Sequence, residues 1–187
     1  MSRIQPVTLW FTGLSGAGKS TLALAVRERL QAAGNNCFVL DGDSVRSGLN
    51  RDLGYSPADR KENIRRIAEV SRLFNEAGIV TIAALISPYR EDRDMARSII
   101  GSARFVETYL AADLETCERR DPKGLYAKAR KGLIPEFTGI SAPYEPPLSP
   151  ELSIPTGTEE KEFCVRQIIE YVSIKYQTHC PLKTAHC

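Results

Sequence analysis

One glycine-rich stretch constrains the fold of this chain more than any other feature. It follows the apolar run Val7–Thr12, and residues 13–20 read GLSGAGKS. The spacing G-x-x-x-x-G-K-S between a predicted strand and a predicted helix is that of a phosphate-binding P-loop. The alternative is a chance glycine turn before an ordinary helix. It would not explain why the motif and the strand and helix on either side of it all indicate a P-loop.

Each residue type in this motif suits the binding of a polyphosphate. Glycines permit backbone conformations that turn successive N–H groups towards phosphate oxygens. Lys19 is placed to reach the β- and γ-phosphates, and the Ser20 hydroxyl is the expected Mg²⁺ ligand. The nucleotide-binding residues are therefore predicted to be Gly13, Ser15, Gly16, Ala17, Gly18, Lys19, Ser20 and Thr21. The motif predicts that the chain binds a nucleoside triphosphate.

Length and composition narrow the classes of protein that remain. The chain has 187 residues, of which 42% are hydrophobic and 26% charged, with a formal net charge of +2. These values are typical of one globular domain, which we place at residues 1–176. So small a charge argues against a protein that binds nucleic acid through bulk electrostatics. We expect a small anionic partner instead.

Cysteine usage and the chain ends bear on the compartment. The five cysteines are widely spaced and odd in number, which favours a reducing environment. Residues 1–6 lack the pattern of a secretory signal, and no apolar run is long enough to cross a bilayer. We expect a cytoplasmic protein without a membrane partner. The tail, 177–187, is expected to be disordered.

Apolar runs alternate with helical periodicities along the chain. Further strands are predicted at 37–40, 79–86, 104–110 and 152–154, and helices at 22–33, 56–77, 91–100 and 159–176. Such alternation predicts a three-layer α/β/α sandwich with a mainly parallel sheet, the fold of P-loop nucleoside-triphosphate hydrolases.

Polar residues that follow the second and third strands are candidates for catalysis. Asp43 follows the strand 37–40 and could orient or deprotonate an attacking hydroxyl, with a share in holding Mg²⁺ through water. Its alternative role is that of a turn or helix-cap aspartate. Ser87 could bond a substrate phosphate or carry a transferred phosphoryl group, whereas its alternative is a cap on the helix 91–100. The residue patterns leave both pairs of alternatives open.

Two further segments suit an anionic substrate. Arg60 and Asn63 lie three residues apart in a helix that Ser56 is expected to cap, so they share a face. The segment of about 117–147 is rich in Lys and Arg around a short helical piece. Such a segment suits a lid that closes over a nucleotide, although a solvated basic helix is the alternative.

Taken together, the segments resemble one family, adenylylsulfate kinase, also called adenosine 5′-phosphosulfate (APS) kinase. The stretches that carry the resemblance are 13–20, 40–46, 48–50, 52–56, 59–66, 86–88, 117–121, 123–126, 137–140 and 143–145. The P-loop is common to many families, but the later stretches together are specific. They run in order over most of the chain.

The resemblance implies a reaction and a set of site residues. The γ-phosphoryl group of ATP would pass to the 3′-hydroxyl of APS, giving 3′-phosphoadenosine 5′-phosphosulfate and ADP in sulfate assimilation. Lys19, Asp43 and Ser87 would be catalytic, and Arg120 would lie near the ATP adenine. The acceptor site would comprise Asp43, Arg46, Tyr55, Arg60, Asn63, Ile86, Ser87, Lys123 and Phe137, with the acceptor adenine between Tyr55 and Phe137. Members of the family are commonly homodimers.

Two competing functions, another small-molecule kinase and a regulatory switch, would require different residues around the P-loop. Another small-molecule kinase of the same fold would act on a nucleoside monophosphate, gluconate or shikimate, but an aromatic clamp suits an adenine. A regulatory switch that hydrolyses nucleotide would need a residue that positions water and would need no acceptor pocket. Arginines at several strand ends favour an acceptor pocket.

Overall fold

The computed structural model describes residues 3–177. Five parallel strands form one sheet in the order β2-β3-β1-β4-β5. The strands are β1 (Thr8–Thr12), β2 (Cys37–Asp41), β3 (Val80–Ala84), β4 (Phe105–Leu110) and β5 (Leu152–Ile154). The predicted parallel sheet is confirmed. Residues 178–187 of the expected disordered tail lie outside the described residues.

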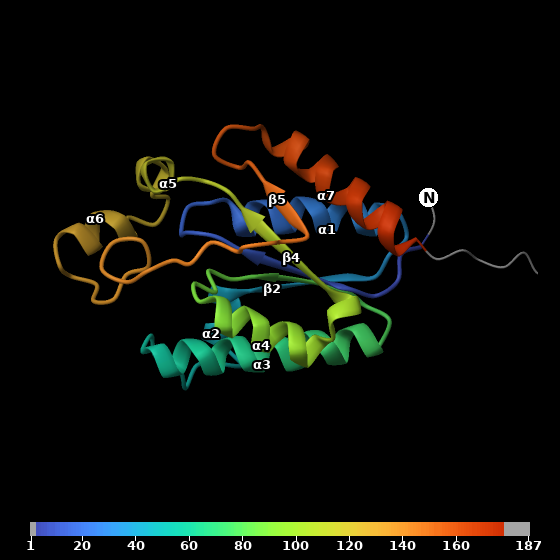
Figure 1. Cartoon of the computed structure of the whole chain (residues 1–187), viewed down its shortest axis with the longest axis horizontal. Coiled ribbons are helices and arrows are strands. Elements are labelled where there is room, and N and C mark those ends of the chain that lie inside the picture. The colour runs from blue at the N-terminus through green and yellow to red at the C-terminus, as the bar shows by residue number, and fades with distance from the viewer. Residues whose placement is uncertain (1–2, 178–187) are drawn as a thin grey trace, which may run out of the picture.

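Helices cover both faces of the sheet (Figure 1). On one face lie α1 (Lys19–Ala32) and α7 (Lys161–Tyr176), and on the other lie α2 (Gly42–Ser47), α3 (Pro57–Glu76) and α4 (Arg90–Ile100). The short helices α5 (Leu114–Arg120) and α6 (Leu125–Arg130) project beyond the ends of the strands. This is the expected three-layer α/β/α sandwich.

The alternation of side chains along β1 creates two apolar cores. Leu9 and Phe11 lie in the core beneath α1 and α7, whereas Trp10 lies in the core beneath α3 and α4. Successive side chains of a strand point to opposite faces, so a fully buried strand reads as a continuous apolar run. β1 pairs with β3 on one side and β4 on the other, which places the residues after β1 at the centre of the carboxyl edge.

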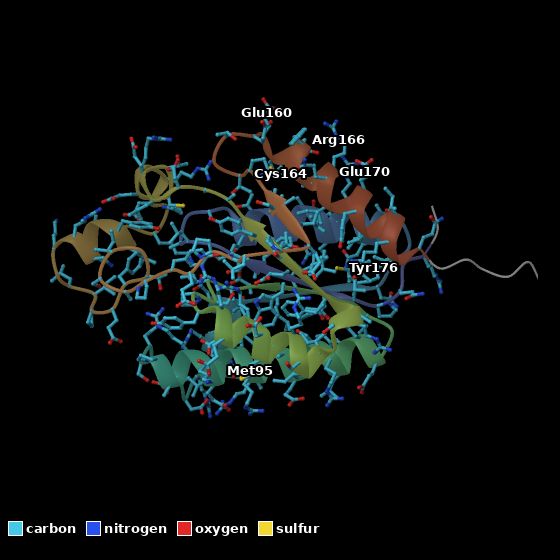
Figure 2. All side chains as sticks on the ribbon, viewed as in Figure 1. Met95, Glu160, Cys164, Arg166, Glu170 and Tyr176 are labelled. Carbon is cyan, nitrogen blue, oxygen red and sulfur yellow. The ribbon has the colours of Figure 1, made fainter. Side chains whose placement is uncertain are left out.

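Local signals set several helix boundaries. Ser56 caps α3 by accepting a hydrogen bond from Asp59 N, and Pro57 is the first helical residue, as predicted. In α7, Ile169 is only partly buried, but it packs against the same core as the fully buried Ile168 and Val172. The buried positions include Cys164, which Figure 2 shows turned towards the sheet.

Among the described residues, no helix is long and apolar enough to cross a membrane.

Candidate active site

One cavity at the carboxyl edge of the sheet collects nearly all the predicted site residues. It has a volume of about 940 Å³. The predicted residues that line it are Ser15, Gly16, Ala17, Gly18, Lys19, Ser20, Thr21, Asp43, Arg46, Tyr55, Arg60, Asn63, Ile86, Ser87, Arg120, Lys123 and Phe137. Gly13 is not among its lining residues. Gly13 is buried behind the loop, where its carbonyl accepts a hydrogen bond from Lys19 Nζ at 2.8 Å.

Backbone geometry shapes the P-loop end of the cavity. Gly16 has φ +78°, and a Cβ there would lie 2.9 Å from the Cys117 carbonyl oxygen. Gly18 is the N-cap of α1, so no side chain caps this helix. The start of α1 therefore presents backbone N–H groups and the positive end of the helix dipole to the cavity.

Lys19 is held close to the P-loop backbone. Its Nζ donates to the carbonyl oxygens of Gly13 at 2.8 Å and Leu14 at 2.7 Å. Burial lowers the pKa of Lys19 to about 8. The Lys19 ammonium is partly desolvated and its hydrogen bonds go to neutral carbonyls. No negative charge in these bonds offsets its own, so it is suited to pair with a phosphate.

The Ser20 hydroxyl faces the carboxylate of Asp41, which was not among the predicted site residues. Ser20 Oγ donates to Asp41 Oδ2 at 2.5 Å, and Asp41 Oδ1 accepts from Asp43 N at 3.0 Å, so Asp41 caps α2. A hydroxyl and a carboxylate are the hard oxygen donors that Mg²⁺ prefers. The residues present therefore fit Mg²⁺ at Ser20 and Asp41. Asp41 ends the strand beside β3, so the position that made Asp43 a candidate also points to Asp41.

Asp43 and Lys123 meet across the cavity. Asp43 lies in the first turn of α2, a helix that was not predicted, and Lys123 lies between α5 and α6. Their side chains form an ion pair with both partners largely exposed. The pair links the short helix after β2 to the segment predicted as a lid.

The two aromatic residues of the predicted clamp differ in exposure. Tyr55 is 66% exposed, and the Arg46 guanidinium lies 4.4 Å from the centre of its ring. Phe137 is only 7% exposed and packs at right angles to Tyr126, with 5.0 Å between ring centroids. Tyr126 in turn donates to the Ser15 carbonyl at 2.9 Å, which connects the predicted lid to the P-loop.

Arg60 and Asn63 share the face of α3 that lines the cavity, as predicted. Arg60 donates to Tyr55 O at 2.8 Å, Glu136 O at 2.9 Å and Thr138 Oγ1 at 3.1 Å. Asn63 is buried and its Oδ1 accepts from Asn50 at 2.9 Å. Arg60 thus also ties α3 to the predicted lid, a contact that the local sequence pattern does not reveal.

Ser87 follows β3 in an unusual conformation. Its φ is +39°, and it is 3% exposed. Ser87 Oγ accepts a hydrogen bond from Trp10 Nε1 at 3.1 Å. The helix-cap alternative for Ser87 is wrong, because Tyr89 is the N-cap of α4 and no side chain of the cap residue bonds there.

Arg120 spans the other end of the cavity. It donates to the carbonyl oxygens of Gly16 at 3.4 Å and Thr156 at 2.7 Å. Thr156, Glu159 and Cys164 also line this end, although they were not predicted as site residues. They follow β5 or begin α7, and the position after a parallel strand was again the available signal.

Comparison with known proteins agrees with this geometry. A family model described as adenylylsulphate kinase matches residues 5–155. A probable adenylyl-sulfate kinase of Halalkalibacterium halodurans is 57% identical over 171 residues, which cover 91% of this chain and 85% of the relative.

Solved structures agree as well. The APS kinase of Mycobacterium tuberculosis, in complex with AMPPNP and APS, has a TM-score of 0.87 and 44% identity, and the match covers 91% of this chain and 99% of that one. A hexameric APS kinase from Thiobacillus denitrificans has a TM-score of 0.70 and 35% identity, over 92% of this chain and 30% of the other. The chain therefore belongs to the adenylylsulphate kinase family and is a kinase that transfers a phosphoryl group.

Proposed function

We propose that this chain transfers the γ-phosphoryl group of ATP to the 3′-hydroxyl of APS, giving 3′-phosphoadenosine 5′-phosphosulfate and ADP in sulfate assimilation. One observation carries the proposal: a single cavity contains a P-loop at one end and a set of cationic and aromatic side chains at the other. Phosphoryl transfer needs donor and acceptor in line, and one continuous cavity allows this.

At the ATP end, the P-loop would hold the phosphates. Backbone N–H groups of residues 15–21 would surround the β-phosphate, and Lys19 would leave its carbonyl partners to pair with the transferred group. Arg120 would lie against the adenine, and its bonds to the Gly16 and Thr156 carbonyls beside the P-loop support this assignment. Lys19 would stabilise the charge that develops during transfer.

Mg²⁺ would be held by Ser20 and Asp41. The ion would supply positive charge that offsets the negative charge of the nucleotide phosphates. The predicted water-mediated share of Asp43 in the metal site stays a weaker alternative, because Asp41 is the carboxylate beside Ser20.

At the acceptor end, Asp43 would orient the 3′-hydroxyl and accept its proton. The ion pair between Asp43 and Lys123 would open as the acceptor enters, which frees Lys123 for the anionic group of APS. Arg46, Arg60, Asn63 and Ile86 would complete this end, and the acceptor adenine would stack between Tyr55 and Phe137. Direct in-line transfer, with Ser87 as a substrate contact, is simpler than a phosphoserine intermediate.

Further expectations concern the whole protein. We propose one catalytic domain over 1–176, with a lid of about 117–147 that includes α6 and the end of α5. A homodimer in the cytoplasm remains our prediction, and analytical ultracentrifugation would test the oligomeric state.

The test is ADP release from ATP and Mg²⁺ with and without APS, using AMP, shikimate and gluconate as comparison acceptors. Stimulation by APS alone, with a 3′-phosphorylated product, is the expected result. Stimulation by another acceptor would overturn the substrate assignment. Release without any acceptor would favour a nucleotide-hydrolysing switch.

A further inference from the structure

Ser87 and Phe137 form two walls of the acceptor end, yet they lie far apart in the sequence. After α6 the chain runs back along the strand ends towards β5 (Figure 1). Glu145 and Pro146 of that return segment bond to residues at the start of α4, and the proposed reaction uses neither of them. The contacts of this segment therefore bear on the distance between Ser87 and Phe137.

Glu145 bonds to the segment after Ser87 through both its backbone and its side chain. Its N–H donates to the Pro88 carbonyl at 2.8 Å, and its Oε2 accepts from Arg90 N at 2.8 Å. Arg90 Nε also donates to the Pro146 carbonyl at 2.8 Å. Since the N-cap of α4 provides no side-chain bond, Glu145 supplies the cap from a distant part of the chain.

Arg93 joins the same two segments from within the protein. It is 2% exposed, and each of its three nitrogens has a different partner. Nε donates to Glu107 Oε1 at 2.6 Å, Nη1 to the Ser87 carbonyl at 2.7 Å and Nη2 to the Glu145 carbonyl at 2.8 Å. One buried guanidinium thus fixes Ser87 relative to Glu145, with its charge offset by Glu107.

Phe137 lies in a hydrogen-bonded loop, residues 137–142, that precedes Glu145 in the chain. The Phe137 carbonyl accepts from the N–H groups of Ile140, Ser141 and Ala142 at 3.0 to 3.1 Å, and Phe137 N donates to Ser141 Oγ at 2.9 Å. The loop from 137 to 142 is therefore held together by its own hydrogen bonds, and only two residues separate it from Glu145. Besides its packing on Tyr126, Phe137 is thus linked through this short segment to Glu145.

We propose that Arg93 and Glu145 are positioning residues for the acceptor: together they hold Ser87 in its left-handed conformation and set the spacing between Ser87 and Phe137. Neither touches ATP or APS in the proposed reaction, on which this inference rests. Loss of Glu145 would widen the distribution of spacings and weaken acceptor binding, while the P-loop end stays unchanged.

The main test compares Glu145→Ala with Glu145→Gln, because Arg93 is buried and its removal risks unfolding. We expect Glu145→Ala to raise the KM for APS about tenfold, since small displacements at a reacting site are costly, while the KM for ATP changes less than about twofold. Glu145→Gln should restore most of the APS affinity, because its amide oxygen can still accept from Arg90 N.

A matched control and a double variant sharpen the test. Glu118→Ala breaks the exposed ion pair with Arg130, also in the lid region, and should leave both KM values unchanged. In Arg93→Lys/Glu145→Ala, the APS KM should rise less than the product of the two single effects, because both residues act on one unit. A multiplicative rise would overturn the proposal.

Other outcomes separate this inference from the proposed function. Equal rises in both KM values for Glu145→Ala, or a lowered Tm with no change in either KM, would show a merely structural role. If the unmutated protein shows no APS-dependent ADP release, the proposed function fails. If it does, but Glu145→Ala behaves as Glu118→Ala does, only the positioning inference fails.

Discussion

Among single residues, Lys19 shows how the cavity is prepared for an anion. Its Nζ donates to two backbone carbonyls of the P-loop, and burial lowers its pKa to about 8. A bound phosphate would favour the charged amine and raise that pKa again. Nucleotide binding and protonation of Lys19 are therefore coupled.

This coupling predicts that ATP binds more weakly as the pH rises above about 8, where the free protein loses the proton on Lys19. At about pH 9 binding should take up protons, and at about pH 7 the uptake at Lys19 should be close to zero. Calorimetric titration with a non-hydrolysable ATP analogue in two buffers of different ionisation enthalpy measures the uptake. Equal heats in both buffers at the higher pH would contradict the predicted proton uptake at Lys19.

Asp43 allows a test of the proposed base. Asp43→Asn retains the shape of the side chain but removes its capacity to accept a proton, so kcat should fall by about 10² to 10⁴-fold. The affinity for ATP should change little, because Asp43 lies at the acceptor end. Steady-state rates with a separate ATP-binding measurement distinguish the two effects. A fully active variant would exclude Asp43 as the base.

Among elements, the loop between β1 and α1 depends on backbone conformations that side chains disfavour. Gly16 has both a positive φ and a close neighbour in the Cys117 carbonyl oxygen. Gly34, just after α1, has φ +81°, and a Cβ added there would meet no atom within 4 Å. A substitution at Gly34 therefore tests backbone strain alone, whereas one at Gly16 tests backbone strain and steric crowding together.

We predict that Gly16→Ala and Gly34→Ala each cost at least about 1 kcal/mol of unfolding free energy, because an alanine is strained at positive φ. Gly16→Ala should cost more and should also abolish ATP binding, since the new methyl group would push the P-loop away from α5. Urea unfolding and ATP titration of both variants provide the check. Normal ATP binding by Gly16→Ala would show that the loop tolerates the shift.

For the whole molecule, local patterns were predictable and long-range contacts were not. The five strands and the cap of α3 follow from apolar runs and from Ser56-Pro57, which are local signals. α2 was missed because six residues are too few for a period to show. Arg93 was missed because charged residues are usually exposed, and only the folded chain brings Glu107 and Glu145 to it.

The interior position of β3, between β2 and β1, makes its side chains sensitive to truncation. Ile82 is fully buried, so Ile82→Ala should lower the unfolding free energy by about 2 to 5 kcal/mol. Phe38→Ala on the edge strand β2 should cost less, because that ring is 51% exposed. Denaturant unfolding monitored by circular dichroism compares the two. A larger loss for Phe38 would mean that the edge of the sheet is covered in solution.

The bond between Trp10 and Ser87 has a practical consequence. Trp10 is the single tryptophan of the chain, and its indole N–H donates to the hydroxyl of a residue that lines the acceptor end. Indole fluorescence depends on the hydrogen bonding and polarity around the ring. The unlabelled protein therefore contains an optical reporter directly behind this wall, and its emission should change when a ligand alters the environment of Ser87.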